Sequence, residues 1–219
     1  MKQYVIFGDS AFAERICNYI RSEHVHKVLC FTNEERYMVK DKINDLDVVP
    51  FEQLSERYDK DSFELIICIG YVKMNRLREQ IYDLCRDEGY RVGSWISSTV
   101  ISYSDDVADG NIVMPNVYIG PNCSIGRGNV IASSCCLSHD NKLGDFNFIS
   151  SSVIFGGHSS VCDNCFIGLN STVRDGIIIN NYSLIGSASN ILKNTDEEGV
   201  YVGNPAYKLE NKRSSTTKI

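Results

Sequence analysis

The stretch VMPNVYIGPNCSIGRGNVIASSCCLSHDNKLGDFNFI, residues 113–149, carries an apolar residue at every sixth position. The same frame runs without a polar residue from Ile101 to Ile191. The sixteen apolar positions are Ile101, Val107, Val113, Ile119, Ile125, Ile131, Leu137, Leu143, Ile149, Phe155, Val161, Ile167, Val173, Ile179, Ile185 and Ile191. An unbroken period of six indicates a repeat architecture in which each hexapeptide forms one short strand and one turn.

The residues that follow these apolar positions predict the shape of the repeat. The next position is small in most hexapeptides, which suits tight corners. We therefore expect a triangular coil in which three hexapeptides make one rung and the inward apolar residues stack from rung to rung. Neighbouring rungs should lie ~4.8 Å apart, like strands in a parallel sheet, and the sixteen repeats predict about five rungs.

The N-terminal part of the chain has the alternating pattern of an α/β domain. Apolar runs predict strands at residues 4–7, 27–32, 46–51 and 63–70, with a further apolar run at 91–96. Amphipathic spacing predicts helices at residues 11–20 and 73–86, the second ending near Gly89. We expect a small parallel sheet with helices on its faces. The predicted parts are an α/β domain at 1–97, the coil at 98–194, and a closing segment and tail at 195–219.

Composition and charge limit the kinds of partner and location. The chain has a net charge of −6 and no basic block, which argues against nucleic acid or an anionic membrane as the main partner. No stretch approaches the ~18 apolar residues of a spanning helix, and the start does not resemble a signal peptide, so we expect a cytoplasmic protein. Its nine cysteines are an odd number and are expected as reduced thiols. The Cys162–Cys165 pair has no second pair to complete a zinc site, so no metal is predicted there.

The repeat register brings one histidine together with three other residues on the outer surface. Because Leu137 points inward, His139 and Asp140 occupy the third and fourth positions of their hexapeptide, which face outward. One rung further along, His139 is followed by Gly157 and Asp140 by His158, so these four residues should form one small patch.

This patch has the groups that acyl transfer requires. A neutral imidazole can accept the proton of an attacking amine or hydroxyl, and a carboxylate can orient the imidazole. A backbone N–H without a side chain in the way can stabilise the oxyanion. Spacing alone leaves open the alternative of two solvated histidines on the surface of a coil.

The segment HDNKLGDF, residues 139–146, resembles the H-[ED]-x-x-x-G-[ED]-F segment of the NeuD/PglD-type sugar acyltransferases. The closing segment ILKNTDEEGVYVGNPAYKL, residues 191–209, is similar to that of the same family. The resemblance implies a Rossmann-like domain followed by a left-handed parallel β-helix, a homotrimer, and acyl-CoA as co-substrate without a metal. It implies that His139 is the general base, that Asp140 is its partner and that Gly157 contacts the thioester carbonyl.

The resemblance also implies a set of CoA contacts and two departures from the family pattern. The implied CoA contacts are Gly157, Gly168, Gly186, Ser187, Lys193 and Pro205, with Lys193 facing a CoA phosphate. Many family members carry Glu where this chain has the shorter Asp140. His158 stands where relatives often have a non-ionisable residue, which makes it a further candidate for acid–base work or substrate contact.

The segment Gly8–Ala13, GDSAFA, is a degenerate G-x-G-x-x-G, with Ser and Ala in the later glycine positions. A tight turn into a helix N-terminus suits phosphate, although small residues there also serve close helix–strand packing. The resemblance implies that this domain holds the nucleotide of a UDP- or dTDP-linked sugar at the carboxyl ends of its strands. The implied contacts are Gly8, Asp9, Ser10, Phe12, Thr32, Asn33, Gly70 and Tyr71.

These observations predict an acyl-CoA-dependent N-acyltransferase, with acetyl-CoA as the expected donor. Its substrate would be the amino group of a nucleotide-linked amino-deoxysugar used in surface polysaccharide. Two alternatives stay open: O-acetylation of a sugar such as a sialic acid, and a non-catalytic scaffold that binds nucleotide sugars. Metal-dependent hydration, which γ-class carbonic anhydrases perform on the same coil, needs three histidine ligands, whereas this coil has only His139 and His158.

Overall fold

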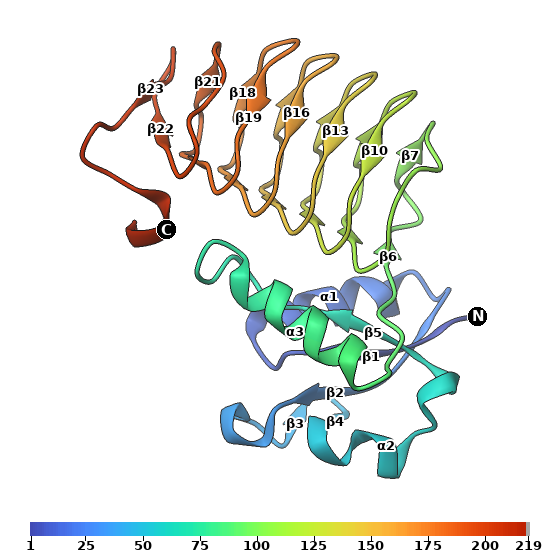
Figure 1. Ribbon diagram of the computed structural model, residues 1–219. Coiled ribbons are helices and arrows are strands. Elements are labelled where there is room, and N and C mark those ends of the chain that lie inside the picture. The colour runs from blue at the N-terminus through green and yellow to red at the C-terminus, as the bar shows by residue number, and fades with distance from the viewer. Residues whose placement is uncertain (218–219) are drawn as a thin grey trace.

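The computed structural model describes residues 1–217 as an α/β domain joined to a three-sided coil of parallel strands (Figure 1). The elements of the α/β domain are β1 (Gln3–Phe7), α1 (Ala11–Ser22), β2 (Lys27–Asn33), η1 (Glu35–Tyr37), β3 (Lys42–Ile43), β4 (Leu46–Pro50), η2 (Phe51–Gln53), α2 (Leu54–Arg57), η3 (Lys60–Ser62), β5 (Glu64–Ile67) and α3 (Arg76–Asp87). The strand order is β3-β4-β2-β1-β5, in which β4, β2, β1 and β5 run parallel and β3 is antiparallel to β4.

The parallel sheet of the N-terminal part is therefore confirmed. The apolar run at residues 91–96 pairs with both parts of the chain: Val92 forms a parallel bridge with Leu65 of β5, and Trp95 and Ile96 form β6, which pairs with the coil. The helix predicted at residues 73–86 begins later than expected, at Arg76. The three residues before Arg76 have positive φ angles, between 52° and 64°, which are incompatible with a right-handed helix.

The coil is built from two- and three-residue strands that form three faces, and within each face neighbouring strands run parallel, apart from β23. Face 1 contains β6 (Trp95–Ile96), β8 (Ile112–Val113), β11 (Val130–Ile131), β14 (Phe148–Ile149), β17 (Phe166–Ile167), β20 (Leu184–Ile185), β22 (Val200–Val202) and the antiparallel β23 (Tyr207–Lys208). Face 2 contains β7 (Ile101–Ser102), β9 (Tyr118–Ile119), β12 (Cys136–Leu137), β15 (Ile154–Phe155), β18 (Thr172–Val173) and β21 (Asn190–Ile191). Face 3 contains β10 (Ser124–Ile125), β13 (Lys142–Leu143), β16 (Ser160–Val161) and β19 (Ile178–Ile179).

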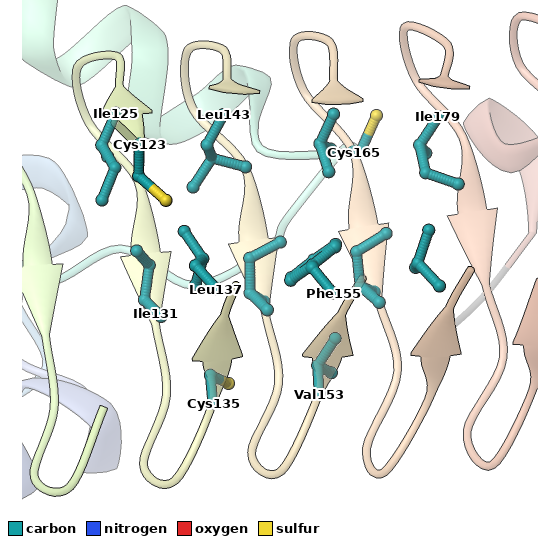
Figure 2. Close-up of a cluster of buried hydrophobic side chains, with 14 of the residues drawn as sticks. Cys123, Ile125, Ile131, Cys135, Leu137, Leu143, Val153, Phe155, Cys165 and Ile179 are labelled. Carbon is teal, nitrogen blue, oxygen red and sulfur yellow. The ribbon is translucent and has the colours of Figure 1, made fainter. Parts of the chain in front are cut away.

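The pairing of these strands has the register that the hexapeptide period predicts. Leu137 pairs with Phe155, and Phe155 with Val173, so that each step along the face is one rung of three hexapeptides. From β8 to β21, the second residue of each strand points into the coil, where it meets thiols and methyl groups from the corners (Figure 2). The strands β7 and β6 pair one residue out of this register, because Ser102 lies opposite Ile119 and Trp95 opposite Ile112. The prediction that Ile101 points inward is therefore wrong, and its side chain is 56% exposed.

The turns of the coil depend on left-handed backbone at one position in each hexapeptide. Asn fills this position at 116, 122, 164 and 170, with φ between 56° and 62°. Asn tolerates the left-handed region better than most residues with a side chain. Asp140 and His158 occupy the same position, with φ of 57° and 58°. Their backbone is thus fixed by the repeat.

The α/β domain packs on the outer side of face 1 (Figure 1). The outward side chains of β6, β8 and β11 share one buried cluster with the apolar side of α1. The guanidinium of Arg78, on α3, is fully buried at this junction and donates to carbonyl oxygens of both parts. The acceptors are Ile69 and Gly70 after β5, and Gly128, Phe146 and Asn147 in the coil.

The cysteines are free thiols and nearly all are buried, as expected for reduced residues. Among the helices of residues 1–217, none has the length and apolar character needed to cross a membrane.

Candidate active site

The corner between faces 2 and 3 carries the histidine patch. His139 and Asp140 lie in the turn from β12 to β13, and Gly157 and His158 lie in the equivalent turn from β15 to β16. The His158 N–H donates to the carbonyl oxygen of His139 at 3.0 Å, which locks the two turns in register. The structure brings the four residues together as the repeat predicts, and the chemical role of each stays a prediction.

The carboxylate of Asp140 orients the imidazole of His139. Nδ1 of His139 lies 2.8 Å from Oδ2 of Asp140, and the side-chain amide of Asn122 donates to Oδ1 at 3.2 Å. The hydrogen bond to His139 holds the pKa of Asp140 below its usual range, so the group is a carboxylate at neutral pH. When Nδ1 donates to this carboxylate, Nε2 is left as the proton acceptor. The arrangement therefore suits a general base.

Gly157 leaves the space that the imidazole of His139 occupies. A Cβ atom at position 157 would overlap Cε1 and Nε2 of the His139 ring. Within residues 1–217, no protein group accepts a hydrogen bond from the Gly157 N–H. This donor therefore lies beside the basic nitrogen and is available to an oxyanion.

His158 is a second imidazole at the same carboxylate. Its Nε2 lies 3.9 Å from Oδ2 of Asp140, and its ring meets that of His139 edge to face, with centroids 5.0 Å apart. One ligand atom from each of His139, Asp140 and His158 lies within 4.8 Å of the others, so the cluster has the donor set for one divalent metal.

Of the predicted CoA contacts, Gly157 lies beside His139, and the other five lie at two other places along the coil. Gly168, Gly186 and Ser187 form a row at the corner between faces 1 and 2, where a side chain on Gly168 would overlap the backbone of the next rung. Lys193 and Pro205 line a pocket at the C-terminal end of the coil, together with Tyr201 and Tyr207. One chain does not bring the glycine row and His139 together, but both corners border face 2.

The predicted nucleotide contacts lie where β1, β2 and β5 end. Several of these side chains already form hydrogen bonds within the protein. The Thr32 hydroxyl is buried and donates to the carbonyl of Val49 at 2.8 Å. The Asp9 carboxylate accepts from the side-chain amide of Asn33 at 3.0 Å and from the N–H of Val39 at 2.9 Å.

The other predicted nucleotide contacts shape the backbone or reach the coil. Gly8 has φ 119°, and a Cβ there would lie 2.9 Å from the carbonyl oxygen of Cys68. Ser10 is the N-cap of α1, and its hydroxyl accepts from the N–H of Ala13. The Gly70 carbonyl accepts from Arg78. The rings of Phe12 and Tyr71 contact Phe148 on face 1, with centroids 6.3 and 5.1 Å apart.

A pocket that the sequence did not predict opens beside these strand ends. It lies between η1 and α3, and its polar lining consists of Asn33, Glu34, Arg36, Tyr37, Lys73 and Gln80. Only Asn33 was predicted to bind a ligand. Lys73 carried no sequence signal, because its position depends on left-handed backbone at residues with ordinary side chains.

No family model matches the chain. Among solved structures, the acetyltransferase domain of PglB from Neisseria gonorrhoeae FA1090 is similar, with a TM-score of 0.84, 16% identity, and coverage of 95% of this chain and 100% of that one. A histidine-to-alanine variant of the GDP-perosamine N-acetyltransferase from Caulobacter crescentus, crystallised with CoA and GDP-perosamine, has a TM-score of 0.84, 20% identity, and coverage of 96% and 98%.

WeeI from Acinetobacter baumannii AYE is also similar, with a TM-score of 0.70, 17% identity, and coverage of 95% of this chain and 100% of that one. At sequence identities of 16–20%, these structural similarities are evidence for the fold alone. The chain therefore has the fold of the hexapeptide-repeat sugar acyltransferases over nearly its whole length.

Proposed function

We propose that this protein is an acetyl-CoA-dependent N-acetyltransferase that acts on the amino group of a nucleotide-linked amino sugar, in the synthesis of surface polysaccharide. The observation that carries the proposal is the corner at which His139, Asp140 and the Gly157 N–H meet. The shared fold supports it, because the similar GDP-perosamine N-acetyltransferase was crystallised with CoA and its nucleotide sugar.

The proposed reaction uses this corner in one addition and one elimination. The sugar amine attacks the thioester carbonyl, and Nε2 of His139 takes the proton that the amine loses. The Gly157 N–H stabilises the oxyanion of the tetrahedral intermediate, and the Asp140 carboxylate stabilises the imidazolium. The C–S bond then breaks, the proton passes from His139 to the departing thiolate, and the products are CoA and the N-acetyl sugar.

A homotrimer is part of the proposal. Face 2 lies between the His139 corner and the glycine row. The outward residues of its middle strands, Tyr118, Cys136 and Ile154, are largely apolar, whereas Thr172 and Asn190 occupy the same position nearer its C-terminal end. Ile154 is 48% exposed in the single chain. A threefold arrangement around face 2 would bury these residues and would set His139 of one copy beside Gly168 and Gly186 of the next. The cleft between the two coils would then hold acetyl-CoA.

The placement of the α/β domain supports the same assembly. This domain packs on face 1, whereas His139 lies at the corner between faces 2 and 3. A nucleotide held at the ends of β1, β2 and β5 would therefore present its sugar to another copy. The Rossmann-like character of this domain, the left-handed course and five rungs of the coil, and the boundaries at residues 97 and 194 are further parts of the proposal.

A panel of acceptors tests the proposed reaction. The purified protein is supplied with acetyl-CoA and with amino sugars linked to UDP, dTDP or GDP, and thiol release is followed while mass spectrometry identifies the product. We expect N-acetylation of at least one nucleotide-linked amino sugar by a particle of three times the 24.6 kDa chain mass. Turnover of a free sialic acid alone would show O-acetylation instead. Binding of a nucleotide amino sugar without any acetyl transfer would show a scaffold.

A further inference from the structure

We propose that His139, Asp140 and His158 also bind one zinc ion, and that the bound ion inhibits acetyl transfer because His139 can no longer act as a base. The inhibition rests on the proposed function, since it is a regulation of the same corner. The binding of the ion does not depend on that function. The metal-free protein is the active form, so the ion is an inhibitor and not a cofactor.

The three side chains have the donor set that zinc prefers. Two imidazole nitrogens and one carboxylate oxygen suit Zn²⁺, whereas Mg²⁺ and Ca²⁺ prefer sites made of oxygen atoms. One ligand atom from each of His139, Asp140 and His158 lies within 4.8 Å of the other two. Within residues 1–217, no other group of three histidine, cysteine or acidic side chains has this spacing. The chemistry of the cluster therefore favours zinc.

The distances between the ligand atoms suit a tetrahedral ion. Oδ2 of Asp140 lies 2.8 Å from Nδ1 of His139 and 3.9 Å from Nε2 of His158. In a tetrahedral site with zinc bonds of about 2.0–2.1 Å, neighbouring ligand atoms are about 3.3 Å apart. The two observed distances lie on either side of this value. Small rotations of the exposed side chains can therefore bring all three ligands onto one ion.

The repeat holds the three residues in place before any ion binds. Asp140 and His158 occupy the left-handed position of turns on consecutive rungs, and the His158 N–H donates to the His139 carbonyl at 3.0 Å. The side-chain amide of Asn122 donates to Oδ1 of Asp140 at 3.2 Å, as the outer partner of a metal-binding carboxylate does. Ligands that are already positioned lose less conformational entropy on binding.

An ion can reach these ligands from solvent. The side chains of His139 and His158 are 54% and 68% exposed, and that of Asp140 is 35% exposed. One rung beyond His158, the same turn position is filled by Gly176, where an added Cβ would have nothing within 4 Å apart from its own chain neighbours. The row of turn residues therefore ends in open space beside His158. A single chain supplies all three ligands.

A bound ion would remove the basic nitrogen of His139. A neutral imidazole has one N–H and one free lone pair. In the metal-free site, the N–H at Nδ1 faces Asp140 and the lone pair is at Nε2. An ion at Nε2 takes this lone pair, whereas an ion at Nδ1 replaces the proton there, and the remaining proton of the neutral ring is then on Nε2. In both cases Nε2 cannot accept the proton of the sugar amine.

Calorimetric titration of the metal-free, full-length protein with Zn²⁺ tests the binding. We expect one ion per chain in the wild type. His158→Asn and Asp140→Asn should each weaken the affinity by at least about tenfold, because each removes one ligand. Asn occupies the same left-handed position in four other turns of this coil, at residues 116, 122, 164 and 170, so both variants keep the turn.

Two further variants control for other zinc ligands. Cys162→Ser removes a half-buried thiol of the coil, and His24→Asn removes an exposed imidazole of the α/β domain. Both variants should bind Zn²⁺ with the affinity of the wild type. Equal affinities in the wild type, His158→Asn and Asp140→Asn would overturn the proposal.

The rate of N-acetylation at increasing Zn²⁺ concentration tests the inhibition, at substrate concentrations below KM. Mass spectrometry measures the product, because Zn²⁺ also binds the thiol of released CoA. We expect half-inhibition within about threefold of the Kd for Zn²⁺, recovery with a chelator, and no effect of Mg²⁺ at the same concentration. In His158→Asn, compared with its own metal-free rate, the half-inhibiting concentration should rise by at least about tenfold.

The failure of each proposal has a different result. A wild-type protein that binds one Zn²⁺ per chain but keeps its full rate at saturating Zn²⁺ would overturn the inhibition and leave the proposed function standing. If the proposed function fails, the metal-free wild type transfers no acetyl group to any nucleotide-linked amino sugar. The calorimetric comparison of the variants would still decide whether this corner binds zinc.

Discussion

At the scale of single residues, Asp140 is the centre of the candidate site. Its two carboxylate oxygens face different partners: Oδ1 accepts from Asn122, while Oδ2 contacts His139 and lies 3.9 Å from His158. Its backbone is held in the left-handed conformation of the coil turn, which fixes the point from which the carboxylate leaves the coil. The shorter Asp thus reaches His139 because both side chains leave the same fixed turn.

The pKa of Asp140 gives a prediction about pH. The hydrogen bond to His139 lowers this pKa below the usual range of an aspartate. A group whose pKa is lower in the folded protein stabilises the fold above its unfolded pKa, and this contribution is lost as the pH falls through the folded pKa. In a carbon-13 NMR titration of the carboxyl group, we expect a midpoint below the ordinary aspartate value. In His139→Ala the midpoint should rise toward that value, and equal midpoints in the two proteins would contradict the account.

The sequence could predict this patch because the repeat fixes its register. Gly157 follows His139 by three hexapeptides, so the period of six is enough to place the two residues side by side on adjacent rungs. Lys73 could not be predicted in this way. Its place depends on three left-handed residues that contain no glycine and are held by contacts with residues about 90 positions later, which local sequence does not reveal.

At the scale of elements, the coil is held together by stacked side chains more than by its individual strands. A two-residue strand has few hydrogen bonds of its own, and the turns depend on strained left-handed residues. The interior rows of Ile, Leu, Val and Phe supply the apolar burial that offsets this strain. The hexapeptide period predicted these rows, but it failed at Ile101, where the chain enters the coil one residue out of the register of the later rungs.

A matched pair of isoleucines tests this description of the coil. Ile149, on β14, is 0% exposed inside the coil, whereas Ile178, on β19, points outward and is 41% exposed. Ile149→Ala should lower the free energy of unfolding by about 2–5 kcal/mol through lost burial and a residual cavity. Ile178→Ala should lower it by less than about 1 kcal/mol. Urea denaturation measures both values, and equal losses would show that the row through Ile149 is not the core.

At the scale of the whole molecule, the joint between domain and coil determines where each substrate part can lie. Arg78 spans this joint, and burial lowers the pKa of its guanidinium to about 9, although the nearby carboxylate of Glu79 opposes the shift. Its five carbonyl partners come from both sides of the joint, so the ends of β5 and the corner of the coil form one unit. The sequence predicted both the α/β domain and the coil, but it did not predict that Arg78 is buried. In the sequence, Arg78 is indistinguishable from an exposed charged residue of an amphipathic helix.

The most direct test of the central claim is the rate of acetyl transfer by a His139→Asn variant, measured with the nucleotide-linked amino sugar that the wild type uses. We expect kcat/KM to fall by about 10²–10⁴-fold, the range for loss of a general base, while CoA affinity changes less than about threefold. The control His24→Asn, at an exposed position outside the coil, should have the wild-type rate. Full transfer activity in His139→Asn would contradict the account.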